Sequence, residues 1–224
     1  MLNVILNGVL NVIIFSICAV FAIIEVTIRK TCRLISRLFE CATYSFSDKD
    51  YAKNFERLEG IDIFNVDGNP VTYKKVFVAL NLLPDSILQL IKDSGLKVIY
   101  SKDSKPVENG KYAGFYCHED NYIYIWDSGL FGSWTWQVVT ILHEVGHFID
   151  IKVGVNNFNS CADVVLHQIC TDEHTYYDKY SNDYFVSNIK EYFAQGFAEY
   201  HLDKEFSEKC PETSSYIEGI INRI

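Results

Sequence analysis

Apolar and polar residues follow different patterns in different parts of the chain. Residues 1–24 contain no charged side chain. A polar region follows, and apolar residues then recur with the spacing of a helix at 75–83 and 86–92. The predicted inner face of these two helices consists of Leu82, Ile87, Leu90 and Ile91.

Three shorter stretches alternate apolar and polar residues, as half-buried strands do. They predict strands at 96–100, 112–117 and 122–126. The polar residues 118–121 separate the last two, which therefore read as a hairpin. Together with the helices, these strands predict an α+β fold.

A longer amphipathic helix is predicted after Ser133, which has the residue type of an N-cap. Apolar residues recur there at positions i, i+3, i+4 and i+7, which predicts one buried face. That face consists of Val138, Ile141, Leu142, Val145, Phe148 and Ile149. The opposite stripe carries His143, His147 and Asp150. Residues 188–200 form another predicted helix.

The N-terminal segment is long enough to cross a membrane. At about 1.5 Å per residue, 24 helical residues span a hydrocarbon core of about 30 Å. We therefore expect 1–28 to be a membrane anchor or a signal segment. A buried core helix is the alternative, but this helix would be apolar on every face and would need apolar neighbours on all sides. The basic residues that follow lie on the C-terminal side, which by the positive-inside rule favours a cytoplasmic body.

The remaining chain divides into a polar juxtamembrane stalk, 29–70, and a folded domain, 71–224. The formal net charge of −9 is uneven, because residues 1–37 carry +3 and the rest carries −12. An acidic body lacks the Lys/Arg-rich face that binds a phosphate backbone. We therefore expect no nucleic acid partner.

The body contains Cys117, Cys161, Cys170 and Cys210 without C-x-x-C spacing, which argues against a structural zinc knuckle. Four cysteines allow up to two disulfides in an exported protein, or buried thiols in a cytoplasmic one.

Residues 143–147 read His-Glu-Val-Gly-His, an H-E-x-x-H motif in the middle of the long predicted helix. One helical turn separates His143 from His147, so both imidazoles project to one side and can share a zinc ion. Glu144 projects about 100° round the helix, beside the metal, where it can take a proton from water. Two half-buried histidines on an ordinary helix are the alternative.

A catalytic zinc usually has three protein ligands, so a third must come from elsewhere. The downstream candidates are Asp150, His167, Glu173, His174, Glu191 and Glu199. Asp150 lies about 10 Å along the axis from His143 and better suits a supporting contact to a ligand. Glu191 lies on the predicted helix 188–200, where Ala194 and Ala198 allow another helix to approach closely. This favours Glu191, with a solvated helix charge as the alternative.

Several motifs in order resemble the anthrax lethal factor-like metallopeptidases, which include the secreted Pro-Pro endopeptidases. They are H-E-x-x-H-F-I-D from His143, then Tyr184, then E-Y-F-A-x-x-F-A from Glu191, then C-P-E-T from Cys210. The resemblance covers about 97–224. It implies a zincin-like fold, with a small, mainly antiparallel sheet over an active-site helix and a helical C-terminal half.

The resemblance also implies residue roles. It makes His143, His147 and Glu191 the ligands of one Zn²⁺ per chain, Glu144 the general base, and Tyr184 a hydrogen-bond donor in the transition state. Two departures stand out. Gln195 occupies a position where relatives often have a second acid, and the turn 118–121 lacks the long substrate loop of Pro-Pro enzymes.

We expect a zinc-dependent endopeptidase that acts on a peptide or protein substrate. The strand with Tyr122, Tyr124 and Trp126 is predicted to hold an extended peptide by edge pairing, or else to form the aromatic half of a buried hairpin. The family favours a membrane-anchored or secreted protein with an extracytoplasmic body.

Two other functions stay open from the sequence. The first is a catalytically silent, membrane-anchored module that binds peptides or proteins with the same fold. The second is a structural metal site, which normally closes with four protein ligands, often cysteines. No cysteine lies in the H-E-x-x-H segment, and this disfavours the structural site.

Overall fold

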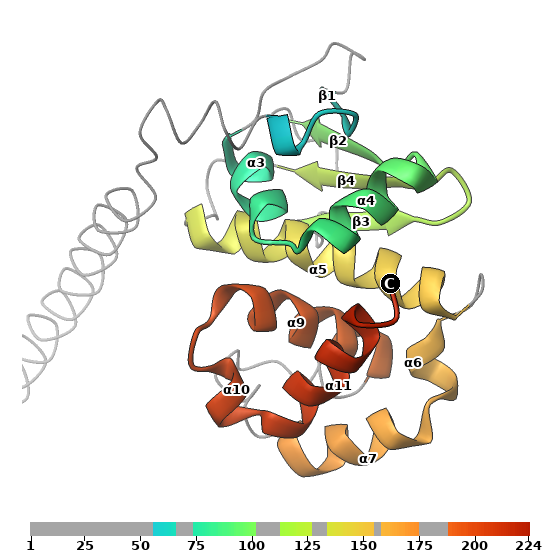
Figure 1. The fold of residues 1–224 in the computed structure, drawn as a ribbon, viewed down its shortest axis with the longest axis vertical. Coiled ribbons are helices and arrows are strands. Elements are labelled where there is room, and N and C mark those ends of the chain that lie inside the picture. The colour runs from blue at the N-terminus through green and yellow to red at the C-terminus, as the bar shows by residue number, and fades with distance from the viewer. Residues whose placement is uncertain (1–55, 66–73, 102–112, 127–133, 155–157, 175–187) are drawn as a thin grey trace, which may run out of the picture. The chain divides into compact units, whose positions relative to one another are not determined.

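A mixed four-stranded sheet forms one layer of the structure, and a long helix, α5, separates it from a helical C-terminal half (Figure 1). The computed structural model describes residues 56–65, 74–101, 113–126, 134–154, 158–174 and 188–224. All of them belong to one unit, Phe46–Ile224. Within these ranges, no helix has the length and apolar character needed to cross a bilayer. The predicted membrane segment 1–28 lies outside the described residues.

The sheet has the strand order β1-β2-β4-β3. Its strands are β1 (Asp62–Asn65), β2 (Lys97–Ser101), β3 (Gly114–Cys117) and β4 (Tyr122–Trp126). The predicted hairpin is confirmed, because β3 and β4 are antiparallel. The expectation of a mainly antiparallel sheet is wrong, because β2 is parallel to both β1 and β4.

The parallel pairing follows from the connections between the strands. Two helices, α3 (Lys74–Asn81) and α4 (Asp85–Ser94), separate β1 from β2 along the chain, and a crossover of this kind joins parallel strands. Strand β1 lies in the segment interpreted as stalk, and its four residues have no pattern that predicts a strand. Both helices were predicted. Ile87 and Ile91 are buried as expected, whereas Leu82 and Leu90 are only half-buried.

Helix α5 (Trp134–Val153) is buried on more sides than the sequence predicts. The predicted apolar face is fully buried, against β3, β4 and α3. The polar stripe is buried as well, because helix α9 (Ile189–Leu202) packs over it, and Asp150 is only 1% exposed. Asn188 caps α9 as its side chain accepts a hydrogen bond from the Lys190 N–H.

The rest of the C-terminal half consists of α6 (Asn159–Ala162), α7 (Val164–Glu173), α10 (Phe206–Lys209) and α11 (Pro211–Ile221). Glu173 at the end of α7 accepts hydrogen bonds from the backbone N–H groups of Glu212 and Thr213, and from the Thr213 hydroxyl. Tyr192 on α9 lies 2.6 Å from the same Thr213 hydroxyl. These contacts join α7, α9 and α11 through polar groups, of which Tyr192 and Thr213 are buried.

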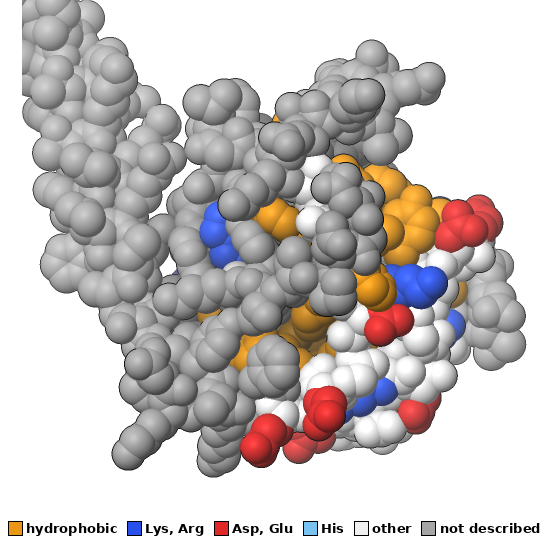
Figure 2. All heavy atoms as spheres, turned by 90° about the horizontal axis from the view of Figure 1, so that it is seen from above, with side chains coloured by type: hydrophobic (Ala, Val, Ile, Leu, Met, Phe, Trp, Pro, Cys, Tyr) orange, Lys and Arg blue, Asp and Glu red, His pale blue; other side chains and the backbone are white. Residues whose placement is uncertain are grey.

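The described surface has a mixed character, and the four cysteines of the body are not paired with one another. From above, the described part of the surface shows acidic side chains interspersed with basic, apolar and uncharged ones (Figure 2). Cys117, Cys161, Cys170 and Cys210 are free thiols, and Cys170 and Cys210 are buried. The structure therefore contains thiols, not disulfides, at these four positions.

Candidate metal centre

Helix α5 presents two imidazoles to the same neighbouring helix. His143 and His147 lie one turn apart, and their ring centroids are 4.8 Å apart. Both side chains are mostly buried, with exposed fractions of 11% and 12%. The helix thus offers two nitrogen donors in a space from which most water is excluded.

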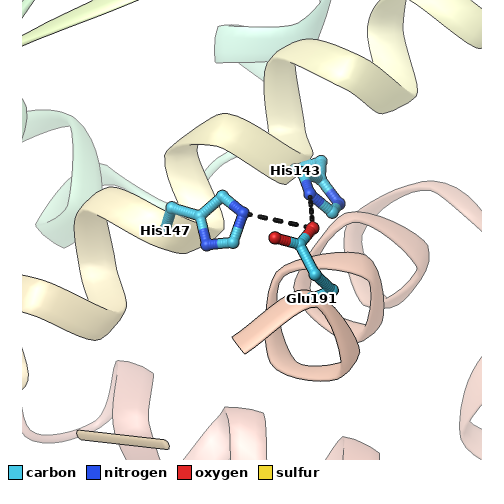
Figure 3. Close-up of side chains that lie close together, drawn as sticks. All are labelled: His143, His147 and Glu191. Carbon is cyan, nitrogen blue, oxygen red and sulfur yellow. Dashed lines mark hydrogen bonds and ion pairs between the residues drawn. The ribbon is translucent and has the colours of Figure 1, made fainter. Parts of the chain in front are cut away.

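Helix α9 places a carboxylate opposite these rings. Glu191 lies in its first turn and points between the two histidines (Figure 3). Its Oε2 atom is 3.0 Å from Nε2 of His143 and 3.5 Å from Nε2 of His147. The three residues offer one ligand atom each within 4.8 Å of one another, so they can hold a metal ion.

The charges in this group reinforce one another. Burial alone would raise the pKa of Glu191, but hydrogen bonds from His143 and His147 outweigh it and hold that pKa well below its usual range. Burial opposes protonation of His147, yet its contact with Glu191 and the nearby charge of Glu144 raise its pKa. The cluster therefore favours a positive charge between its three members.

Residues 119–220 match the family model described as "Anthrax toxin lethal factor, N- and C-terminal domain". This segment is a lethal factor-type domain. It contains all three members of the candidate metal centre and most of α11. A comparison with curated proteins gives no match.

In this lethal factor-type domain, the two histidines have different surroundings on their second ring nitrogen. Nδ1 of His143 lies 3.2 Å from Oε1 of Gln195, and the Gln195 amide nitrogen donates to Oε1 of Glu199 over 3.0 Å. Nδ1 of His147 is buried and has no hydrogen-bond partner among the described residues. Its ring instead meets Phe158 edge to face, with centroids 6.0 Å apart.

Glu144 lies beside the ligand group of the lethal factor-type domain but is not part of it. Its side chain is buried, and this raises the pKa of its carboxyl, while the charges of His143 and His147 act in the opposite direction. The carboxyl also accepts a hydrogen bond from the backbone N–H of Tyr116 on β3. The sheet edge and the metal centre therefore meet at Glu144.

Asp150 was predicted to support a metal ligand. Among the described residues, it makes no hydrogen bond to His143, His147 or Glu191. Its two oxygens accept from the backbone N–H and the hydroxyl of Ser160, at 2.8 and 2.5 Å. Its negative charge still helps to raise the pKa of His147. Asp150 thus fixes the start of α6 beside the centre.

The other third-ligand candidates lie outside the ligand group. Glu173 binds the start of α11, His174 contacts the Thr171 carbonyl, and Glu199 binds Gln195. His167 is an exposed residue of α7. Tyr184, the expected transition-state donor, lies outside the described residues.

The expected edge pairing through the strand of Tyr122, Tyr124 and Trp126 is wrong. That strand, β4, lies between β2 and β3 and has a neighbour on each side. Tyr122 and Tyr124 both pack on Phe115 of β3, as the hairpin alternative expects. A contact between substrate and these three side chains stays a prediction.

Proposed function

We propose that this chain is a zinc-dependent endopeptidase with a zincin-like fold. The observation that carries the proposal is the convergence of two imidazole nitrogens on one carboxylate oxygen, at 3.0 and 3.5 Å. Ligand atoms about 2.0–2.1 Å from a tetrahedral zinc are about 3.3–3.4 Å apart, so the spacing suits this ion. His143, His147 and Glu191 would hold it, which leaves a fourth position for water or substrate.

A zinc ion held by these three residues would supply Lewis acidity, which lowers the pKa of water and polarises a carbonyl. Glu144 acts as the general base. Its buried position brings its pKa closer to the working pH, and the Tyr116 N–H fixes one of its oxygens. We assign Tyr184 the role of donor to the oxyanion that develops in the transition state.

The sheet geometry supports a peptide as substrate. In the described sheet, β3 is the edge strand next to α5. Because the Trp126 N–H donates to the Ala113 carbonyl, the backbone groups of Gly114 and Tyr116 point away from β4. The Tyr116 N–H is held by Glu144, so an extended peptide would pair with the Gly114 groups and the Tyr116 carbonyl and would lie beside Glu144.

Metal analysis and substrate profiling test this function. The full chain should contain one zinc, and Glu191→Ala should lose most of it because only two protein ligands remain. The zinc-loaded protein should cleave members of a diverse peptide library. If wild-type protein prepared with ample zinc contains none, the metal assignment is overturned. Zinc-loaded protein that binds library peptides without cleaving them would instead be a silent binding module.

We further propose that residues 1–28 attach the protein to a membrane or direct its export, with the body outside the cytoplasm. The uncharged 24-residue start of the chain supports the membrane or export segment. The family resemblance supports the outside position of the body, which the basic residues after the segment oppose. A reporter fused after Ile224 should be active outside the cytoplasm, and activity confined to the cytoplasm would reverse the topology.

A further inference from the structure

Three polar side chains, of which the second and third are buried, form a line that starts at the metal centre and continues along α9. Gln195 and Glu199 follow Glu191 at intervals of one helical turn and lie on the same stripe. They are 2% and 4% exposed. Nδ1 of His143 contacts Oε1 of Gln195, and the amide nitrogen of Gln195 contacts Glu199.

The chemistry of the groups gives these contacts a direction. A side-chain amide has one donor nitrogen and one acceptor oxygen, and the Gln195 nitrogen donates to Oε1 of Glu199. The Gln195 oxygen is then turned toward His143, where it can only accept a hydrogen bond, so Nδ1 is the nitrogen that carries the proton. When a metal is bound, a proton on Nδ1 would leave the Nε2 lone pair available to the ion at the site shared with Glu191.

We propose that Gln195 and Glu199 are positioning residues that set the orientation and tautomer of His143 for metal binding. Gln195 holds the ring directly, and Glu199 keeps the Gln195 amide from turning over. A neutral amide therefore stands next to His143, and the acid lies one helical turn further along α9. This arrangement supports a ligand without a second carboxylate beside Glu191 and Glu144.

The proposal rests on the proposed function only in that His143 is a zinc ligand. Partners that hydrogen-bond a ligating histidine typically contribute 10-fold to 100-fold to metal affinity. We therefore expect Gln195→Met in the full chain to weaken zinc binding by about that factor. Glu199→Met should weaken zinc binding less, by about several-fold. The Gln195 side chain is still present in this variant, but its amide nitrogen has lost its acceptor.

Two variants separate positioning from general stability. Glu199→Gln keeps an acceptor for the Gln195 amide, so its zinc affinity should stay within about twofold of wild type. Tyr192→Phe is the matched control, because it removes another buried hydrogen bond from α9, the one to Thr213, without touching His143. It should lower the free energy of unfolding and leave zinc affinity unchanged.

The experiment measures zinc affinity by competition with a chelator and records the imidazole proton resonances of the zinc-loaded protein by NMR. The Nδ1 proton of His143 should be visible and slow to exchange in wild type and Glu199→Gln, and should exchange faster in Gln195→Met. Unchanged affinity in Gln195→Met, or an equal loss in Glu199→Gln and Glu199→Met, would overturn the proposal. A fast-exchanging Nδ1 proton in wild type would also overturn it, without any variant. None of these readouts depends on peptide cleavage.

Discussion

Gly146 lies directly against Ala194, at the point where α5 packs on α9. A Cβ atom at Gly146 would come within 2.9 Å of the Ala194 Cα and 3.1 Å of its carbonyl oxygen. Both are backbone atoms, which cannot move without moving the helix. The absence of a side chain at Gly146 therefore sets how closely Glu191 approaches the two histidines.

Gly146→Ala should force the two helices apart. Overpacking of this kind typically costs about 1–3 kcal/mol, so urea unfolding should show a loss in that range together with weaker zinc binding. Gly219→Ala on α11 is the matched control, because a Cβ there meets no atom within 4 Å. It should be neutral or stabilise by up to about 1 kcal/mol, since alanine is the better helix former. Equal effects at both glycines would contradict the packing argument.

Glu144→Gln keeps the size of the side chain and removes the base. Turnover should fall by a factor on the order of 10² to 10⁴, while zinc content and folding remain as in wild type. Steady-state kinetics on a cleaved library peptide, combined with metal analysis, would check this. Wild-type turnover in Glu144→Gln would show that another group takes the proton.

Tyr184→Phe tests the residue that the family resemblance assigns to the oxyanion. Loss of one donor should lower kcat by roughly 10² to 10³, with little change in KM if the bond forms only as charge develops. An increase in KM with unchanged kcat would instead make Tyr184 a substrate-binding residue.

His201 should make stability depend on pH. Burial lowers the pKa of this histidine to about 4, and its Nε2 atom has no hydrogen-bond partner among the described residues. The unfolded chain then binds more protons than the folded one between about pH 6.5 and pH 4. The His201 contribution is fully present above that window, and up to about 3 kcal/mol is lost as the pH falls through it.

The variant His201→Leu isolates this contribution. Its free energy of unfolding, relative to wild type, should rise as the pH falls from 6.5 toward 4, in denaturant titrations at several pH values. Parallel curves for the two proteins would contradict the assignment to His201.

The candidate centre was largely predictable because its ligands sit on strongly periodic helices. The spacing of His143 and His147 and the helical pattern around Glu191 placed all three side chains, and the structure brings them together. Burial of the polar stripe of α5 was not predictable, because nothing in the periodicity of one helix says which helix will cover it. The contact between His143 and Gln195 was missed for the same reason, because it joins α5 to α9.

The sheet was harder to predict than the helices. Hairpin partners are close in sequence and their alternation is visible, which is why β3 and β4 were found. Strand β1 has only four residues, and its partner β2 lies beyond two helices. Its pairing depends on long-range contacts, which local patterns do not encode.

The contact between His143 and Glu191 joins positions 48 residues apart in the chain. A metal ion bound by both would cross-link the folded chain around this long loop. Unlike a disulfide, which persists in the unfolded chain, the ion is released when the two helices separate, so it stabilises the folded chain by its own binding free energy. Folding and metal supply would then be thermodynamically linked, so that the folded fraction rises with the concentration of free zinc. A cell compartment poor in zinc would silence the protein by leaving it easier to unfold and degrade, before any catalytic step is lost.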